Sequence, residues 1–148
     1  MNLKLTRKQL DSLVKLVYLG NWLANSWRTD DVMKEFDEIE SLVLEAAEEN
    51  GLGKYVDHLE ESGRDEALPS AELEEETEEI VDLYNDSTFW DQLIYRMADR
   101  DYARLYGEEA LEALFSAEGM EKEQPLIEKY EKEFYDHGLD RLVIRRDN

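Results

Sequence analysis

The sequence has 148 residues, 42% of them hydrophobic, and contains no cysteine. This length fits one domain with a core of its own, while the absence of cysteine excludes disulfides, iron–sulfur clusters and cysteine nucleophiles. The net charge of −21 disfavours direct binding of nucleic acids and of anionic membranes, because both carry the same sign of charge.

The charge is unevenly distributed along the chain. Residues 1–28 carry five basic residues and one acidic residue, whereas residues 29–91 carry three basic and 23 acidic residues. The longest apolar stretch, residues 13–27, contains Lys15 and is shorter than the roughly 20 residues of a membrane span. Lys15 also interrupts the apolar region that a secretion signal would need. We therefore expect a cytoplasmic protein without a membrane span.

The first expected helix begins after Thr6 and runs to about Arg28. Its apolar residues point in nearly every direction, which predicts a central core helix buried on several sides. Gly20 in mid-helix indicates close approach of another backbone. The alternative is a self-association face, or one wall of a pocket. The candidate binding residues on this helix are Asn21, Trp22, Asn25 and Trp27.

The second expected helix opens at Thr29, where a hydroxyl cap is followed by two carboxylates. Its apolar residues recur at steps of three and four, and they are Val32, Phe36, Ile39, Val43 and Ala46. The glycines at 51 and 53 end it. A short third helix is expected over residues 54–61, followed by a loop over 62–70.

The stretch 70–86 holds eight acidic residues in seventeen and predicts a fourth helix over 71–85. Its acidic residues Glu75, Glu79, Asp82 and Asp86 fall on the side opposite its apolar residues. The pattern is typical of an amphipathic helix with an acidic, solvent-exposed face. A cation or a basic neighbour would relieve the repulsion between these like charges, which keeps a functional role open.

A turn at 85–87 leads into a fifth expected helix over 88–106, which we expect to lie antiparallel to the fourth. Asp101 falls within the apolar stripe of this helix and therefore needs a partner. Arg100 and Arg104 lie near the edge of the stripe, where they could reach Asp101 or a partner helix. We expect a buried, paired structural aspartate; the alternatives are a functional carboxylate and a helix whose end leaves the core. Together with Arg96, the two arginines form a row at steps of four. This row either compensates the neighbouring acidic helices or binds a phosphate or carboxylate.

The remaining chain predicts a short sixth helix over 108–117 and a last helix from about Pro125 to Tyr135. Residues 139–146 are expected to form a short strand or a packed tail. The expected fold is therefore all-α. It is one domain over residues 1–148, built as a bundle of six or seven helices around the first.

Two carboxylate pairs at i, i+3 spacing form a candidate metal site, and they are Glu35 with Glu38 and Glu79 with Asp82. Facing pairs of this kind suit Mg²⁺ or Mn²⁺, which prefer oxygen ligands. The arrangement resembles the all-α nucleoside-triphosphate pyrophosphatases. That resemblance implies a metal-dependent phosphohydrolase, although the gap between the pairs is longer than in that family. Apart from this alternative we expect no cofactor.

The segments "VYLGNWLANSWR" and "FWDQLIYRMADRDY" together resemble small bacterial helical proteins of unassigned activity. The resemblance covers about a quarter of the chain and implies no function. The sequence contains no nucleophile motif and no glycine-rich phosphate loop, so we assign no catalytic residue. We expect a protein that works through protein–protein contact, with a homodimer as one form. A further alternative is an acidic decoy that occupies a nucleic-acid-binding protein.

Overall fold

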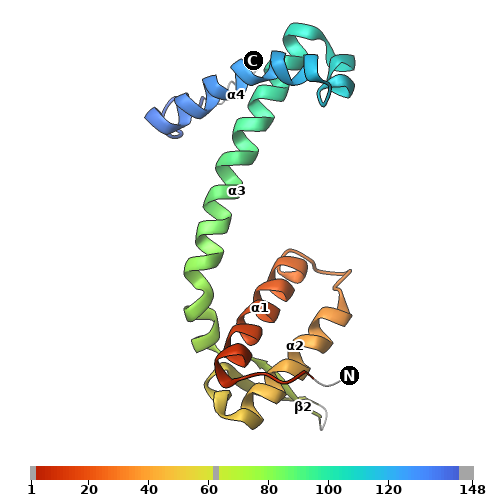
Figure 1. The fold of residues 1–148 in the computed structure, drawn as a ribbon, viewed down its shortest axis with the longest axis vertical. Helices are drawn as coiled ribbons and strands as arrows, with labels where there is room; N and C mark the ends of the chain where they lie inside the picture. Colours follow the sequence, from red (N-terminus) through yellow and green to blue (C-terminus); the bar gives the residue numbers. More distant parts are fainter. Residues whose placement is uncertain (1–2, 62–63, 144–148) are drawn as a thin grey trace. The chain divides into compact units, whose positions relative to one another are not determined.

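The structure is a computed structural model that describes residues 3–61 and 64–143. The chain divides into two compact units, residues 1–83 and 84–148, and each is described by itself. The described chain is mostly helical, as the sequence indicates. The helices and strands that begin in the first unit are α1 (Arg7–Asn25), α2 (Lys34–Ala47), β1 (Val56–Glu61), β2 (Arg64–Pro69) and α3 (Ala71–Tyr106) (Figure 1).

Helix α1 begins where the sequence predicts, because Thr6 forms a capping box with Gln9. The Thr6 side chain accepts a hydrogen bond from the backbone of Gln9, and the Gln9 side chain accepts one from the backbone of Thr6. The helix ends at Asn25, a few residues earlier than expected. It packs side by side with α2 (Figure 1).

The core of the first unit gathers buried side chains from every element around the short irregular turn that follows α2. This turn comprises a π-helical segment, η1 (Glu48–Leu52), and a 3-10 segment, η2 (Gly53–Tyr55). The buried side chains are Val14, Leu44, Ala47, Leu52, Tyr55, Val56, Ala67 and Leu73. Only Val14 and Asn21 of α1 are buried, so burial of α1 on several sides is not confirmed.

Residues 56–61 and 64–69 form two antiparallel strands, where a short helix and a loop were predicted. Strand β1 pairs with β2 in a register that runs from Val56 opposite Pro69 to Glu61 opposite Arg64. The segment 57–61 is mostly polar, so it lacks the alternating apolar pattern that indicates a strand. What holds the strands is non-local, because Val56 and Ala67 are buried in the core. The expectation of a helix over 54–61 is therefore wrong.

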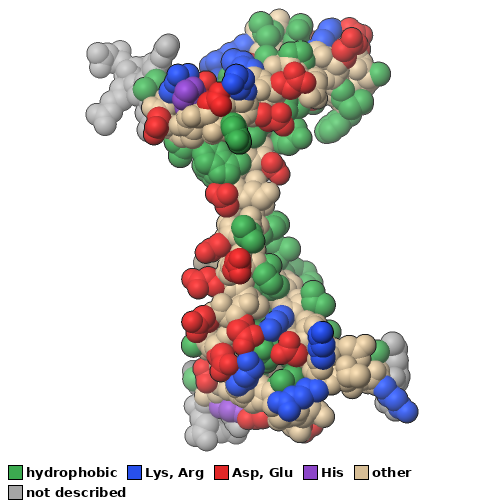
Figure 2. Space-filling view, turned by 60° about the vertical axis from the view of Figure 1, so that its left-hand side comes forward, with side chains coloured by type: hydrophobic (Ala, Val, Ile, Leu, Met, Phe, Trp, Pro, Cys, Tyr) green, Lys and Arg blue, Asp and Glu red, His purple; other side chains and the backbone are tan. Residues whose placement is uncertain are grey.

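Helix α3 is continuous from Ala71 to Tyr106, where two helices joined by a turn were expected. Ser70 caps its start, accepting a hydrogen bond from the backbone of Leu73. At the expected turn, Asp86 instead accepts a hydrogen bond from the indole of Trp90 one turn later. Asn, Asp and Ser disfavour a helix interior only weakly, and without glycine or proline they do not stop it. Acidic side chains, red in Figure 2, follow the N-terminal half of α3.

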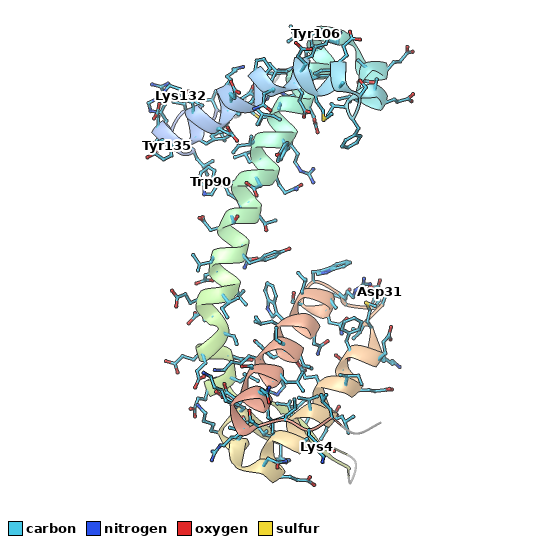
Figure 3. The ribbon with its side chains drawn as sticks, in the orientation of Figure 1. Lys4, Asp31, Trp90, Tyr106, Lys132 and Tyr135 are labelled. Atoms are coloured by element: carbon cyan, nitrogen blue, oxygen red, sulfur yellow. The ribbon has the colours of Figure 1, made fainter. Side chains whose placement is uncertain are left out.

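The second unit packs the C-terminal part of α3 against α4 (Ala117–His137). Its buried core comprises Ala98, Ile127, Tyr130 and Phe134. Trp90 packs against this core, with its ring 5.9 Å from that of Phe134 (Figure 3). The 3-10 segment η3 (Glu108–Ala113) leads into α4. Gly119 is required there, because a Cβ would lie 2.4 Å from the backbone oxygen of Ala113.

Several C-terminal boundaries differ from those expected. The expected helix over 108–117 is the shorter η3, and α4 starts at Ala117, so Pro125 lies inside the helix and not near its start. A serine cap explains the early start, because Ser116 accepts a hydrogen bond from the backbone of Gly119. Residues 139–143 form no strand, and 144–146 lie outside the described residues. The bundle of six or seven helices is not confirmed.

Candidate functional site

The two predicted asparagines of α1 lie together and bind α2. The Asn21 amide donates to Asp37 at 3.1 Å and to Glu40 at 2.8 Å. The Asn25 amide donates to Asn21 at 2.8 Å and accepts from the backbone of Met33 at 2.9 Å. These contacts satisfy both amides, as semi-buried amides require. They tie the end of α1 to the start of α2.

Glu40 lies at the buried end of this amide cluster. Burial raises the pKa of its carboxyl, the bond from Asn21 opposes that rise, and nearby Asp37 adds to it. Two carboxylates that share one amide could suggest a cation site. Within residues 3–61 and 64–143, however, no group of three or more potential ligands is placed to hold a metal ion. The hydrogen bonds of this cluster join α1 to α2.

The tryptophans of α1 differ in their surroundings. Trp22 is half-buried, whereas Trp27 is 68% exposed and stacks only on the Arg28 guanidinium, 4.3 Å from its ring. On α1, Leu16 is 66% exposed and Leu23 is 52% exposed, and Trp27 follows in the turn after the helix ends at Asn25. The spacing of Leu16 and Leu23 places both side chains on one side of the helix, opposite the buried Val14. We call this side, with Gly20 in its middle, the outer face of α1.

The helix residues of the outer face, Leu16, Gly20 and Leu23, carry no charge. The residues beside it, Gln9, Ser12 and Leu19, are also uncharged. A Cβ added to Gly20 would meet nothing within 4 Å. The close approach that Gly20 predicts is therefore not made within the described chain, and the space beside it is open.

The four carboxylates of the predicted metal site remain on the surface. Glu35 and Glu38 lie on α2, and Glu79 and Asp82 lie on α3, all exposed. The described residues contain no cluster of histidine or carboxylate side chains that could hold a metal. The structure thus does not assemble these four into a Mg²⁺ or Mn²⁺ site.

Asp101 forms the ion-pair network that its place in the apolar stripe requires. Arg100 donates to its Oδ1 at 2.9 Å and Arg104 at 3.3 Å, both from α3 itself. From α4, Lys129 donates to Oδ2 at 3.0 Å, and the Tyr130 hydroxyl donates to the same oxygen. The expected pairing with both arginines is present. Lys129 and Tyr130 were not predicted as partners of Asp101.

Several hydrogen bonds keep Asp101 ionised. Desolvation alone would raise its pKa, but bonds from Tyr130, Lys129 and Arg100 hold that pKa well below its usual range. Through these bonds Asp101 joins α3 to α4.

The predicted arginine row lines an open groove of about 630 Å³ in the second unit. Arg96, Arg100 and Arg104 face this groove, together with Asp99 and Glu108. The expected role of compensating a neighbouring acidic helix is wrong, because the acidic residues lie on the same helix, α3. We call these three residues the arginine row.

A second tyrosine network lies in the first unit and was not predicted. The Tyr55 hydroxyl lies 2.8 Å from Asp11 on α1 and 2.7 Å from Glu76 on α3. Lys15 and Lys54 both bind Glu76, Lys15 at 2.6 Å. Bonds from Lys15, Lys54 and Tyr55 lower the pKa of Glu76 to about 2. These residues lie far apart in sequence, so no local pattern indicated them.

Comparison with family models, with curated proteins and with solved structures finds no match to this chain. Across the part of the chain that the structure describes, no helix is both long and apolar enough to cross a membrane.

Proposed function

We propose that this protein works through protein–protein contact and self-associates through the outer face of α1. The observation that supports this proposal is the exposure of Leu16 and Leu23, each more than half exposed on the side of α1 away from the core, with the exposed Trp27 in the turn that follows. Single exposed apolar residues are normal on protein surfaces and need no explanation. A row along one helix face is different, because a second helix can cover it in one step.

Burying such side chains supplies the free energy for contact. Complete burial of a large apolar side chain is worth about 1.5–3 kcal/mol, and here the gain is limited to the fraction still exposed. Gly20 lets a second backbone come close, since nothing occupies the space beside it. Glycine lowers the stability of a helix, and the close contact with a second copy compensates for that loss at this position.

Charge favours this face for self-association over the rest of the surface. Two copies with a net charge of −21 each repel one another. The outer face has no carboxylate, so two copies that meet there bury no unpaired charge. The acidic surface elsewhere would place like charges in contact.

Sedimentation velocity in 0.5 M NaCl tests the proposal, because salt screens the repulsion and leaves an apolar contact intact. We expect the wild type to form a dimer and Leu23→Glu to sediment as a monomer. Leu42→Glu is the matched control. Leu42 is 58% exposed on α2, so its substitution makes the same chemical change on a different surface. A monomeric wild type, or equal effects of the two variants, would refute the proposal.

A further inference from the structure

A small pocket of about 250 Å³ lies beside the C-terminal part of α4, wholly within the second unit. Three parts of the chain form its apolar lining. Met97 comes from α3, Tyr130 and Phe134 come from α4, and Leu142 comes from the segment that follows α4. Because one water molecule takes about 30 Å³ of the liquid, this volume corresponds to about eight water molecules.

The lining of this pocket gives water little to bind. Tyr130 and Phe134 are buried, and their rings stack with centroids 5.9 Å apart. Met97 packs against the same core. Leu142 is 44% exposed, so part of the apolar wall is open to solvent. An apolar group that takes the place of water against these walls therefore binds favourably.

A glycine turn completes the pocket. Gly138 follows the end of α4 with a φ of +54°, in the region that favours glycine. Its backbone N–H donates to the backbone oxygen of Phe134 at 2.9 Å. After the turn the chain runs back along α4, and the Arg141 guanidinium lies 3.3 Å from the Glu133 carboxylate. The turn thereby brings Arg141 and Leu142 to the pocket.

Positive charge gathers at the mouth of the pocket, although the chain as a whole is acidic. Lys129 and Arg141 line the pocket with side chains that are 58% and 62% exposed. Arg141 is paired with Glu133, whereas Lys129 shares Asp101 with two arginines of α3. These ion pairs join four cations to two carboxylates, so they leave an excess of positive charge beside an apolar pocket.

We propose that this pocket binds a monocarboxylate with an unbranched apolar chain, the chemistry of a medium-chain fatty acid. The chain lies against Tyr130, Phe134 and Leu142, and the carboxylate accepts hydrogen bonds from Lys129 and Arg141 at the mouth. A methylene group occupies about as much space as a water molecule, so a chain of about eight heavy atoms fills the pocket. An apolar lining with a few polar groups that fix orientation is the usual build of a small-molecule site.

The acidic character of the chain does not prevent this binding. The net charge of −21 belongs mostly to carboxylates elsewhere in the sequence. At 0.15 M ionic strength the Debye length is about 8 Å, so exposed charges farther from the mouth are largely screened. Lys129 and Arg141 act at contact distance. The nearest charges therefore decide which end group the pocket accepts.

An NMR titration of the full ¹⁵N-labelled chain at about 0.15 M NaCl tests the proposal. Octanoate is the probe, and octanol is its uncharged match. We expect octanoate to shift the amides of Gly138 and Leu142 saturably. Octanol should bind about tenfold more weakly, because it lacks two exposed ion pairs. Hexanoate should also bind about tenfold more weakly than octanoate, since it buries two methylene groups fewer.

Two pairs of variants separate the charge from the apolar wall. Arg141→Gln is expected to weaken octanoate about threefold and to leave octanol unchanged. Arg96→Gln is its control, because Arg96 is exposed and does not line this pocket. Leu142→Ala should weaken both probes alike. Leu105→Ala is the control for that change, since Leu105 is 64% exposed on α3 and lies outside the pocket lining.

Three results would overturn the proposal. The first is the absence of saturable shifts at Gly138 and Leu142, and the second is octanol that binds the wild type as tightly as octanoate does. The third concerns the source of the carboxylate, because a peptide C-terminus has the same end group. Tighter binding of acetyl-Gly-Gly-Leu than of octanoate would assign the pocket to a protein tail. None of these results bears on the α1 contact, because the pocket uses no residue of the first unit.

Discussion

Each of the two units contains a tyrosine hydroxyl that forms a hydrogen bond with an ionised carboxylate. In residues 1–83, Tyr55 binds Glu76, which Lys15 and Lys54 also hold. In residues 84–148, Tyr130 binds Asp101, whose other partners include Arg100 and Lys129. The aromatic ring is buried in both, and a lysine lies over each ring.

The two networks differ in how deeply the carboxylate lies. The side chain of Glu76 is 32% exposed, whereas that of Asp101 is 16% exposed. Water can still solvate Glu76 when a partner is removed, but Asp101 depends more on its partners. Tyr55 has a second carboxylate, Asp11, within reach, while Asp101 is the one carboxylate that Tyr130 contacts among the described residues. We therefore expect the loss of one hydrogen-bond partner to destabilise the first unit less than the second.

The largest expected effect follows from removing the buried carboxylate. Asp101→Ala removes the acceptor that Arg100, Lys129 and the Tyr130 hydroxyl share, and because both cations are largely exposed, the cost is that of the lost charged hydrogen bonds, about 3 kcal/mol in all. Urea denaturation followed by Trp90 fluorescence measures the loss in the second unit. Asp91→Ala is the control, because Asp91 is exposed on the same helix and has no ion pair in the described chain. Equal losses in the two variants would contradict the special role of Asp101.

A smaller effect is expected from removing a tyrosine hydroxyl. Tyr130→Phe takes one donor from Asp101, and Tyr55→Phe takes one from Glu76. A hydrogen bond to a charged group contributes about 1.5–3 kcal/mol, and the more solvated Glu76 places Tyr55→Phe at or below the lower limit. We expect Tyr130→Phe to cost more, as measured by the urea midpoint of each variant. The reverse order would show that the exposure of the carboxylate does not set the cost.

Acid should weaken both networks. The folded pKa of Glu76 is about 2, below its ordinary value of 4.5, so its contribution is complete above about pH 4.5 and lost as pH falls toward 2. The lowered pKa of Asp101 gives the same sign, whereas burial raises the pKa of Glu40 and favours folding at low pH. Glu76→Gln is therefore expected to lower the melting temperature at pH 7 and to have little effect at pH 2. An equal effect at both pH values would contradict the assignment.

The sequence predicted the helices and the needs of single side chains better than the contacts between elements. Thr6 as a cap and the arginines near Asp101 both follow from local chemistry. The polar strand β1 could not be predicted from local chemistry, because its pairing partner and its buried neighbours come from elsewhere in the chain. The continuity of α3 was missed since Asn85, Asp86 and Ser87 are turn-forming residues that a long helix tolerates.

The candidate surfaces were predictable only in part. The arginine row and the acidic residues Glu75, Glu79 and Asp82 are visible as spacing in the sequence, but they were assigned to two antiparallel helices. In the structure both sets belong to α3, and their side chains are exposed. The outer face of α1 was read mainly as core, because an apolar residue gives the same signal whether its own chain or another covers it. Gly20 was the informative residue, since its close approach is missing from the described chain.

The smallest expected effect has opposite signs in the free chain and in the assembly. Gly20→Ala adds a methyl group into open space, so the single chain gains about 0.5–1 kcal/mol of helix stability. If a second helix packs against the outer face, the same methyl group holds the two backbones apart and weakens the dimer. Thermal melts in a Leu23→Glu background report the first effect, and dimer dissociation in 0.5 M NaCl reports the second. A variant that is more stable alone and dimerises as tightly as the wild type would place the contact away from Gly20, whereas a weaker dimer would locate it there.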